Sequence, residues 1–281
     1  MSRTQTTRPC AVCGTFYPED PGTLREEVQA MIHKGLVPET PATPLGVIAP
    51  HAGYMYSGPT AAAAYARLAG RRFETVLVAS PSHRDAFADV SVYPGAAYET
   101  PLGPVFLDTE LREALIAESS VVTASPLGHR SEHAIEVQLP FLQVILGDFK
   151  LVPLVLGSQT REVCLELGEL LGRVCAGRQI LLVASTDLSH YFPADAADAL
   201  DGVARDDISR FDEDRLMDDL DQGRTEACGG GPMVAVMKGL RLLGATRMEI
   251  VQHCTSGDIT GDRRSVVGYC SAVAWEDSPD A

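Results

Sequence analysis

Short, almost uniformly apolar runs alternate along the chain with stretches in which apolar residues recur at helical spacing. The apolar runs are Gly46–Ala49, Thr75–Ala79, Lys150–Leu156 and Gln179–Ala184. The helical patterns lie at Thr23–Lys34, Thr109–Ser119, Val163–Val174 and Met233–Leu243. Strands without polar alternation are typical of a parallel sheet that is covered on both faces. The pattern therefore predicts an α/β fold, a single-domain sandwich with a mostly parallel central sheet flanked by helices.

The stretch from Ser131 to Leu142 also has helical spacing, with apolar residues on one face. Ser131 is placed to cap this helix, and Pro140 is expected to kink it. His133 and Glu136 are three residues apart, so the pattern predicts that they share a face.

Ionisable side chains follow three of the apolar runs directly. His51 follows Ala49-Pro50, His83 follows Pro81-Ser82, and Ser185–Tyr191 contains Asp187 and His190. Carboxyl ends of parallel strands meet at one edge of a sheet, where open α/β sheets present groups to ligands. We therefore expect these four side chains to converge. A single histidine in such a loop is equally compatible with a hydrogen bond that only holds a turn.

Cys228 stands in a glycine-rich loop just before a predicted helix. Free amides and the helix dipole at such a position favour the thiolate. Together with His51 and His83 it would form a three-ligand site, whose donors suit copper, iron or zinc better than magnesium or calcium. Asp187 and His190 would then supply a carboxylate and a titratable base beside the metal.

The remaining cysteines and the acidic stretch point to structural roles. Cys10 and Cys13 form a Cys-x-x-Cys pair without a second pair at zinc-ribbon spacing, so a structural or incidental role is favoured. Cys164, Cys175 and Cys270 lie in apolar segments and are expected in the core. The acidic stretch Asp195–Gln222 lacks the spacing of an EF-hand and is interpreted as solvated helix faces.

Size and charge limit the classes of function. The 281 residues, 45% of them hydrophobic, suffice for one domain, with an ordered core at about 9–275 and a flexible tail at 276–281. A formal net charge of -15 argues against a nucleic-acid partner. The sequence has no signal-like start and no apolar run long enough for a bilayer, which argues against a membrane. The seven cysteines do not resemble a disulfide framework, so a cytoplasmic location is expected.

Five ordered motifs closely resemble those of the Memo family, whose bacterial and archaeal members are called AmmeMemoRadiSam system protein B. The resemblance covers about Pro9 to Trp275, and the motifs are Pro50–Gly58, Pro81–His83, Glu132–Pro140, Ser185–Tyr191 and Thr255–Asp258. It implies a fold similar to the class III extradiol dioxygenases, with a metal pocket at one end.

The resemblance also implies roles for individual residues. His51 and His83 match the metal-ligand histidines, and Cys228 matches the cysteine ligand of the family. His190 occupies the position of the catalytic histidine of the dioxygenases, and Asp187 belongs to the same pocket. The dioxygenases complete their ligand set with a carboxylate, so Cys228 is a departure that puts aromatic ring cleavage in doubt.

Three functions are compatible with this set. The first is an iron- or copper-dependent oxidoreductase, dioxygenase-like, in which O₂ or a small-molecule substrate meets Tyr54 and His133. The second is a non-catalytic metal-handling protein, and the third is a module that binds a peptide or partner in the same pocket. The family name further implies a functional link to radical-SAM and AMMECR1-type proteins.

Overall fold

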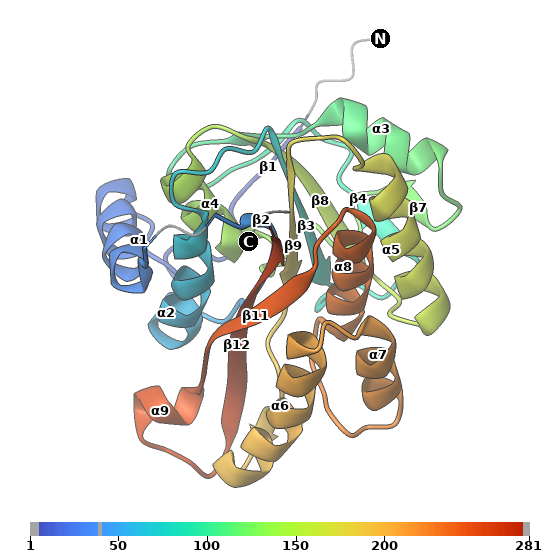
Figure 1. Cartoon of the computed structure of the whole chain (residues 1–281). Coiled ribbons are helices and arrows are strands. Elements are labelled where there is room, and N and C mark those ends of the chain that lie inside the picture. The colour runs from blue at the N-terminus through green and yellow to red at the C-terminus, as the bar shows by residue number, and fades with distance from the viewer. Residues whose placement is uncertain (1–5, 39–40, 278–281) are drawn as a thin grey trace.

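Four parallel strands form the centre of the molecule. The computed structural model describes residues 6–38 and 41–277. Its central strands lie side by side in the order β2 (Thr43–Ala49), β9 (Ile180–Ser185), β3 (Thr75–Pro81) and β8 (Lys150–Leu156) (Figure 1). These strands coincide with the four apolar runs of the sequence. The predicted fold class, a mixed α/β domain with a central sheet between helices, is confirmed.

Further strands extend this sheet on both sides. Beyond β2 the added strands are antiparallel: β12 (Val266–Glu276), with β10 (His190–Phe192) and β11 (Arg247–Thr255) paired to it. Beyond β8 the sheet continues with β4 (Val90–Val92) and β7 (Val122–Ala124). A separate small sheet consists of β1 (Thr7–Arg8), β5 (Ala97–Tyr98) and β6 (Val105–Phe106). The centre of the sheet is thus parallel throughout, and its four strands are almost completely buried.

Alternation along each strand divides the core between two layers of helices. Val47 and Ala49 belong to the apolar cluster on one face, whereas Ile48 belongs to the cluster on the other. The first face is covered by α1 (Pro21–Gly35), α2 (Tyr54–Tyr65) and α4 (Leu139–Leu146). The opposite face is covered by α3 (Thr109–Ala117), α5 (Arg161–Val174) and α8 (Gly230–Leu242) (Figure 1). Since both faces are covered, the central strands carry apolar side chains throughout.

The prediction of a helix that starts at Ser131 is wrong. A single 3₁₀ turn, η2 (Glu136–Gln138), precedes α4, which begins only at Leu139. Pro140 therefore sits in the first turn, where its missing N–H is not needed, and it kinks nothing. His133 lies before the turn and does not share a helix face with Glu136. The apolar spacing was correct only for the second half of the stretch.

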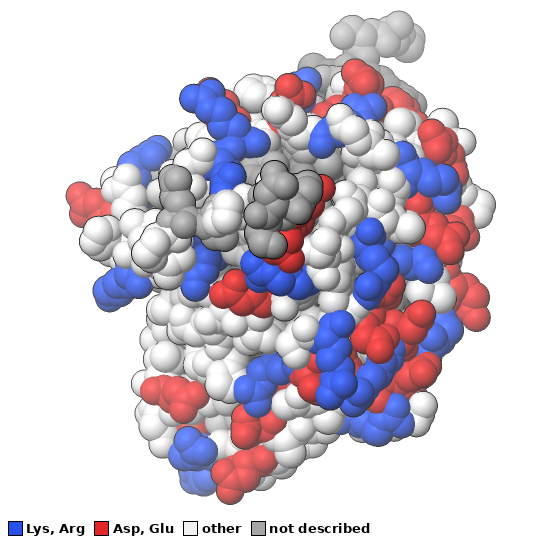
Figure 2. Space-filling view, viewed as in Figure 1, with Lys and Arg blue, Asp and Glu red and all other residues white. Residues whose placement is uncertain are grey.

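The acidic stretch forms α6 (Ala194–Ser209) and α7 (Glu213–Asp221), where acidic and basic side chains are interleaved on the visible face (Figure 2). The interpretation as solvated faces is wrong for Asp201 and Glu213, which are buried, and it is equally wrong for the buried pair Asp207 and Asp219. Arg215 lies between them, with Nε 2.8 Å from Oδ1 of Asp207. These two carboxylates join α6 and α7 and do not face solvent.

Three further expectations concern the cysteines, the tail and the membrane. Cys164, Cys175 and Cys270 are buried in the core, as predicted. The predicted flexible tail starts at Glu276, which is the last residue of β12, and residues 278–281 lie outside the described part. No helix in the described part of the chain has the length and apolar character needed to cross a bilayer.

A buried ion pair ties the N-terminal segment to the body. Glu136, with no exposed surface, contacts Nη1 of Arg8. Its carboxylate also accepts hydrogen bonds from the amides of Ala11 and Val12, at 2.7 and 3.0 Å, and from the hydroxyl of Tyr17 at 2.5 Å. The segment that follows, residues 14–18, forms one wall of the cavity described below. One carboxylate therefore holds a cavity wall in place.

Replacing Glu136 by Ala should lower the free energy of unfolding by about 3–5 kcal/mol, because it leaves the Arg8 guanidinium buried without a countercharge. Urea denaturation with a fluorescence readout measures this. The matched control is Glu110→Gln, which removes a pair with Arg178 in which Glu110 is 81% exposed and should cost less than about 1 kcal/mol. Equal losses in the two variants would contradict the structural role of Glu136.

Candidate metal centre

The ends of β2 and β9 are locked side by side in the region where His51 leaves the sheet. Ala49 pairs with Ser185 at the last register position, and the amide of Thr186 donates to the carbonyl of Ala49 at 3.0 Å. Two residues further along each chain, the amide of His51 donates to Oδ1 of Asp187 at 2.8 Å. The parallel register therefore continues into the loops as side-chain contacts.

Cys228 reaches this edge from the loop between α7 and α8. Its amide donates to the carbonyl of Asp187 at 3.2 Å, and the amide of Gly229 donates to Oγ1 of Thr186 at 2.9 Å. A Cβ atom on Gly229 would lie 2.5 Å from the carbonyl oxygen of Ser185, so only glycine permits this approach. The loop is thus fitted closely against the end of β9.

His51, His83 and Cys228 bring their ligand atoms to within 4.8 Å of one another. Sγ of Cys228 lies 3.2 Å from Nε2 of His51, and the rings of His51 and His83 have centroids 5.1 Å apart. Two imidazole nitrogens and a sulfur at such separations match the donor set of a transition-metal site. The three residues that the sequence suggested as ligands therefore lie together.

The pKa values of the Cys228 thiol and the His51 imidazole are compatible with the binding of a metal cation. Burial raises the pKa of the Cys228 thiol to about 12, and the neighbouring Asp187 charge adds to the rise. The expectation that the helix start would favour a thiolate is thus wrong for the protein without metal, because burial outweighs the amide contacts. Burial also lowers the pKa of His51 to about 3, so its imidazole is neutral. A neutral imidazole beside a thiol whose proton a bound cation can displace fits a metal site.

Glu132 supports His83 through both its backbone and its ring. Oε2 of Glu132 accepts the amide of His83 at 2.6 Å, and Oε1 lies 2.9 Å from Nδ1 of the same residue. Oε1 also accepts the amides of His133 and Ala134, at 2.8 and 3.0 Å.

His83, Glu132 and His133 form a second set of clustered ligand atoms. Three donors already occupy Oε1 of Glu132, so its lone pairs are used and the carboxylate orients the ring of His83 instead of binding a metal. Nδ1 of His133 lies 3.2 Å from Oε1, but the directions are not those of a hydrogen bond.

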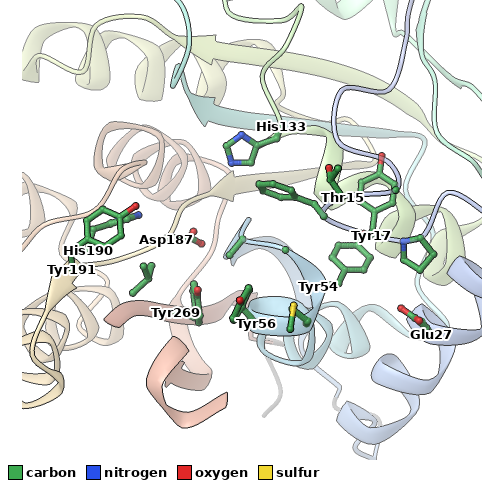
Figure 3. A pocket seen from close by; sticks show the side chains of 17 residues that line it. Thr15, Tyr17, Glu27, Tyr54, Tyr56, His133, Asp187, His190, Tyr191 and Tyr269 are labelled. Atoms are coloured by element: carbon green, nitrogen blue, oxygen red, sulfur yellow. The ribbon is translucent and has the colours of Figure 1, made fainter. Parts of the chain in front are cut away.

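A cavity of about 530 Å³ is lined by residues that contact the donor group, although His51, His83 and Cys228 themselves do not line it (Figure 3). Asp187 and His133 line it and contact the donor group, Asp187 through the amide of His51 and His133 through a ring whose centroid is 5.4 Å from that of His51. The other walls are largely aromatic and include Phe16, Tyr17, Tyr54, Tyr56, Tyr191 and Tyr269. The hydroxyl of Tyr54 donates to the carbonyl of Val137 at 2.7 Å, so this residue offers its ring to the cavity.

His190 lies on another wall of the cavity, at the start of β10 (Figure 3). Its amide donates to Oε1 of Glu226 at 2.7 Å. A charge on His190 would lower the pKa of both His51 and Asp187, which places it within electrostatic reach of the donor group. Tyr191 beside it has a left-handed backbone with φ of 68° and is 75% exposed at the cavity.

Comparison with known proteins identifies the family of this chain. The model of the family described as "Memo-like protein" matches residues 8–273. The chain belongs to the Memo family. A MEMO1 family protein of Methanothermobacter thermautotrophicus is 39% identical over 92% of this chain and 97% of its own length. One from Methanocaldococcus jannaschii is 37% identical over 94% and 97%.

Among solved structures, an uncharacterized protein of Escherichia coli K12 is similar to this chain with a TM-score of 0.47 and 15% identity, over 82% of this chain and all of the other. This likeness is too weak to carry an argument about the site.

All seven residues suggested by the sequence lie in or beside this region: His51, His83, Cys228, Asp187, His190, Tyr54 and His133. Sequence reasoning missed the supporting residues Glu132, Gln138 and Ser185. Glu132 and Gln138 are part of the motif Glu132–Pro140, and Ser185 opens the motif Ser185–Tyr191 at the end of an apolar strand. Their position in motifs was a signal, but only the hydrogen bonds show what they contact.

Protein treated with a chelator should lose stability as the pH falls below 6.5. Burial lowers the pKa of His133 from 6.5 to about 4, so between these values the unfolded chain binds a proton that the folded chain does not. The neutral imidazole of His133 makes its full contribution to the free energy of unfolding above pH 6.5, and this contribution is lost as the pH falls. Lowering the pH from 7 to 5 should reduce the free energy of unfolding by about 2 kcal/mol through His133 alone.

Urea unfolding at both pH values tests this with His133→Gln, which should show a drop smaller by about that amount. His33→Gln, a change at an exposed histidine of α1, serves as the control and should keep the full drop. An unchanged drop in His133→Gln would show that His133 is not held neutral.

Proposed function

We propose that this chain is a metal-dependent redox protein of the Memo type. His51, His83 and Cys228 would hold iron or copper, with zinc as a further candidate, and the adjoining cavity would admit a small-molecule substrate or O₂. The observation that carries the proposal is the meeting of two imidazoles and one thiol within 4.8 Å beside a cavity of about 530 Å³. Thiolate and imidazole ligands are those that copper, iron and zinc prefer.

The chain's own residues would prepare the reaction. A bound iron or copper ion supplies one-electron redox chemistry. Asp187 fixes the backbone of His51 through its 2.8 Å hydrogen bond. His190, on the cavity wall, is positioned to hold or move a proton of the substrate as general acid or base. The aromatic walls, which include Tyr54, would exclude water and stack against a planar substrate. His133, which lines the same cavity next to His51, would also contact the substrate.

A second candidate function is metal handling without turnover. The specific observation in its favour is Cys228, a softer donor than the carboxylate of the dioxygenases, which favours tight binding of copper or iron over ring opening. Storage does not require a base beside the donors, and His190 and Asp187 favour the redox function for that reason. A peptide or partner in the same cavity would be a third use of the fold.

The cellular setting belongs to the same proposal. We propose a cytoplasmic protein that works with radical-SAM and AMMECR1-type proteins. The free state of all seven cysteines fits a reducing compartment.

Metal analysis of protein purified without oxygen, followed by oxygen-uptake recording with catechols among the substrates, tests the proposal. Stoichiometric iron or copper with substrate-dependent uptake supports a redox enzyme. Tight metal without uptake favours metal handling, and protein that binds neither metal contradicts both.

Replacing Cys228 by Ser should weaken iron or copper binding at least about tenfold, because a hydroxyl is a far poorer ligand than a thiolate. Competition with a chelator of known affinity measures the change. Cys254→Ser is the matched control: this thiol is also half-buried but lies 3.1 Å from the hydroxyl of Thr60, outside the donor group. Unchanged affinity in Cys228→Ser would remove this residue from the site.

Replacing His190 by Ala should leave metal affinity intact and reduce turnover by about 10²–10⁴-fold, the usual contribution of a general acid or base. Oxygen uptake on any substrate that the wild-type protein oxidises gives the rate. His253→Ala, which removes an exposed histidine of β11, should change neither quantity. Parallel loss of metal and rate in His190→Ala would make His190 a ligand.

A further inference from the structure

A buried chain of hydrogen bonds runs from Tyr65 through Gln138 and Ser185 to Nδ1 of His51. The four side chains are at most 1% exposed, so each polar atom depends on its protein partners. Tyr65 lies on α2, Gln138 ends η2, Ser185 ends β9, and His51 follows β2. Elements from distant parts of the sequence thus meet at one ring nitrogen of a candidate ligand.

The orientation of the Gln138 amide is fixed by a group that can only accept. One end of this amide lies 3.1 Å from the carbonyl oxygen of Pro50, and a carbonyl has no proton to give. That end must be the NH₂ group, which also lies 2.8 Å from Oγ of Ser185. The amide oxygen then faces the other way and accepts the hydroxyl of Tyr65 at 2.8 Å. Gln138 is therefore a donor to Ser185.

The single proton of the Ser185 hydroxyl is fixed in the same way. Oγ lies 2.7 Å from the carbonyl oxygen of Ala134, which can only accept. Ser185 gives its proton there and keeps two lone pairs, one of which accepts from Gln138. The remaining lone pair faces Nδ1 of His51 at 3.0 Å.

These contacts determine the tautomer of the ring. With Ser185 acting as an acceptor, a bare Nδ1 would place two lone pairs against each other in a site without water access, so Nδ1 must carry the proton. Nε2 is then the bare nitrogen, and it is the one that lies 3.2 Å from Sγ of Cys228. The ring thus presents its lone pair to the donor group without a rearrangement.

We propose that Ser185 is a positioning residue of the metal centre: with Gln138 and Tyr65 behind it, it holds His51 as the Nδ1-protonated tautomer with Nε2 free to bind a cation. The inference deepens the proposed function and rests on it for its effect on metal binding. The tautomer itself is a property of the metal-free protein and stands independently. A metal-ligating histidine with its other nitrogen fixed by a hydrogen bond binds more tightly than one without such support.

Two readouts test the proposal. Long-range ¹⁵N–¹H correlations of the metal-free wild-type protein should show His51 with its proton on Nδ1. Replacing Ser185 by Ala should mix or reverse the tautomers and weaken Co²⁺ binding, followed by its thiolate absorption, by about 10–100-fold. Ser271→Ala is the matched control, since this serine is also fully buried in the sheet and its Oγ has no hydrogen-bond partner. It should bind Co²⁺ like the wild type.

The outcomes separate the two proposals. A wild-type His51 protonated on Nε2 overturns the positioning role, with no variant needed, as does Ser185→Ala with an unchanged tautomer and wild-type Co²⁺ affinity. Wild-type protein that binds no Co²⁺, or Cys228→Ser that binds it equally well, overturns the proposed function instead. In that case the tautomer of the metal-free protein still decides the positioning of His51 by Ser185.

Discussion

The parallel register of β2, β9 and β3 is the constraint on which the site depends. Because Ala49 pairs with Ser185 and Ala79 with Ala184, the three strands end at one edge of the sheet and deliver His51, His83 and Asp187 there. A shift of one residue in any strand would turn its side chains to the opposite face and separate the ligand atoms. The same strands pack apolar side chains against helices on both faces, so the core and the geometry of the donors depend on one register.

Burial gives the donor group its chemical character. Without a cation, burial keeps the imidazole of His51 neutral and raises the pKa of the Cys228 thiol to about 12, while the buried carboxylate of Asp187 has a raised pKa for the same reason. A bound cation would reverse this balance, since it offsets the cost of a buried thiolate and replaces its proton. The same elements supply the support: Glu132 accepts from His83, and Ser185 accepts from His51. The polar network is therefore arranged to leave ring nitrogens available for a cation.

The sequence allowed the central strands and most helices to be predicted, because buried parallel strands are uniformly apolar. The side chains that follow these strands can be read from the order of residues, so the convergence of His51, His83, Asp187 and His190 could also be predicted, whereas their roles stay predictions. The Memo motifs then narrowed the choice of ligands. The start of α4 was predicted too early because Ser131 and the apolar spacing are typical of a capped helix. In the structure Glu136 is paired with Arg8, and α4 begins only at Leu139. The burial of four acidic residues in the stretch was missed because charge runs are usually solvated: Asp201, Asp207, Glu213 and Asp219. The roles of Ser185 and Gln138 depend on contacts 47 residues apart in the chain, which no local pattern encodes.

The most direct test of the central claim is X-ray absorption spectroscopy of the metal in protein purified without oxygen. If His51, His83 and Cys228 hold iron or copper, the spectrum contains one sulfur neighbour together with imidazole nitrogens, and the sulfur contribution disappears in Cys228→Ser. A metal surrounded only by oxygen and nitrogen in the wild-type protein, or one whose sulfur neighbour persists in Cys228→Ser, would contradict the assignment of this centre.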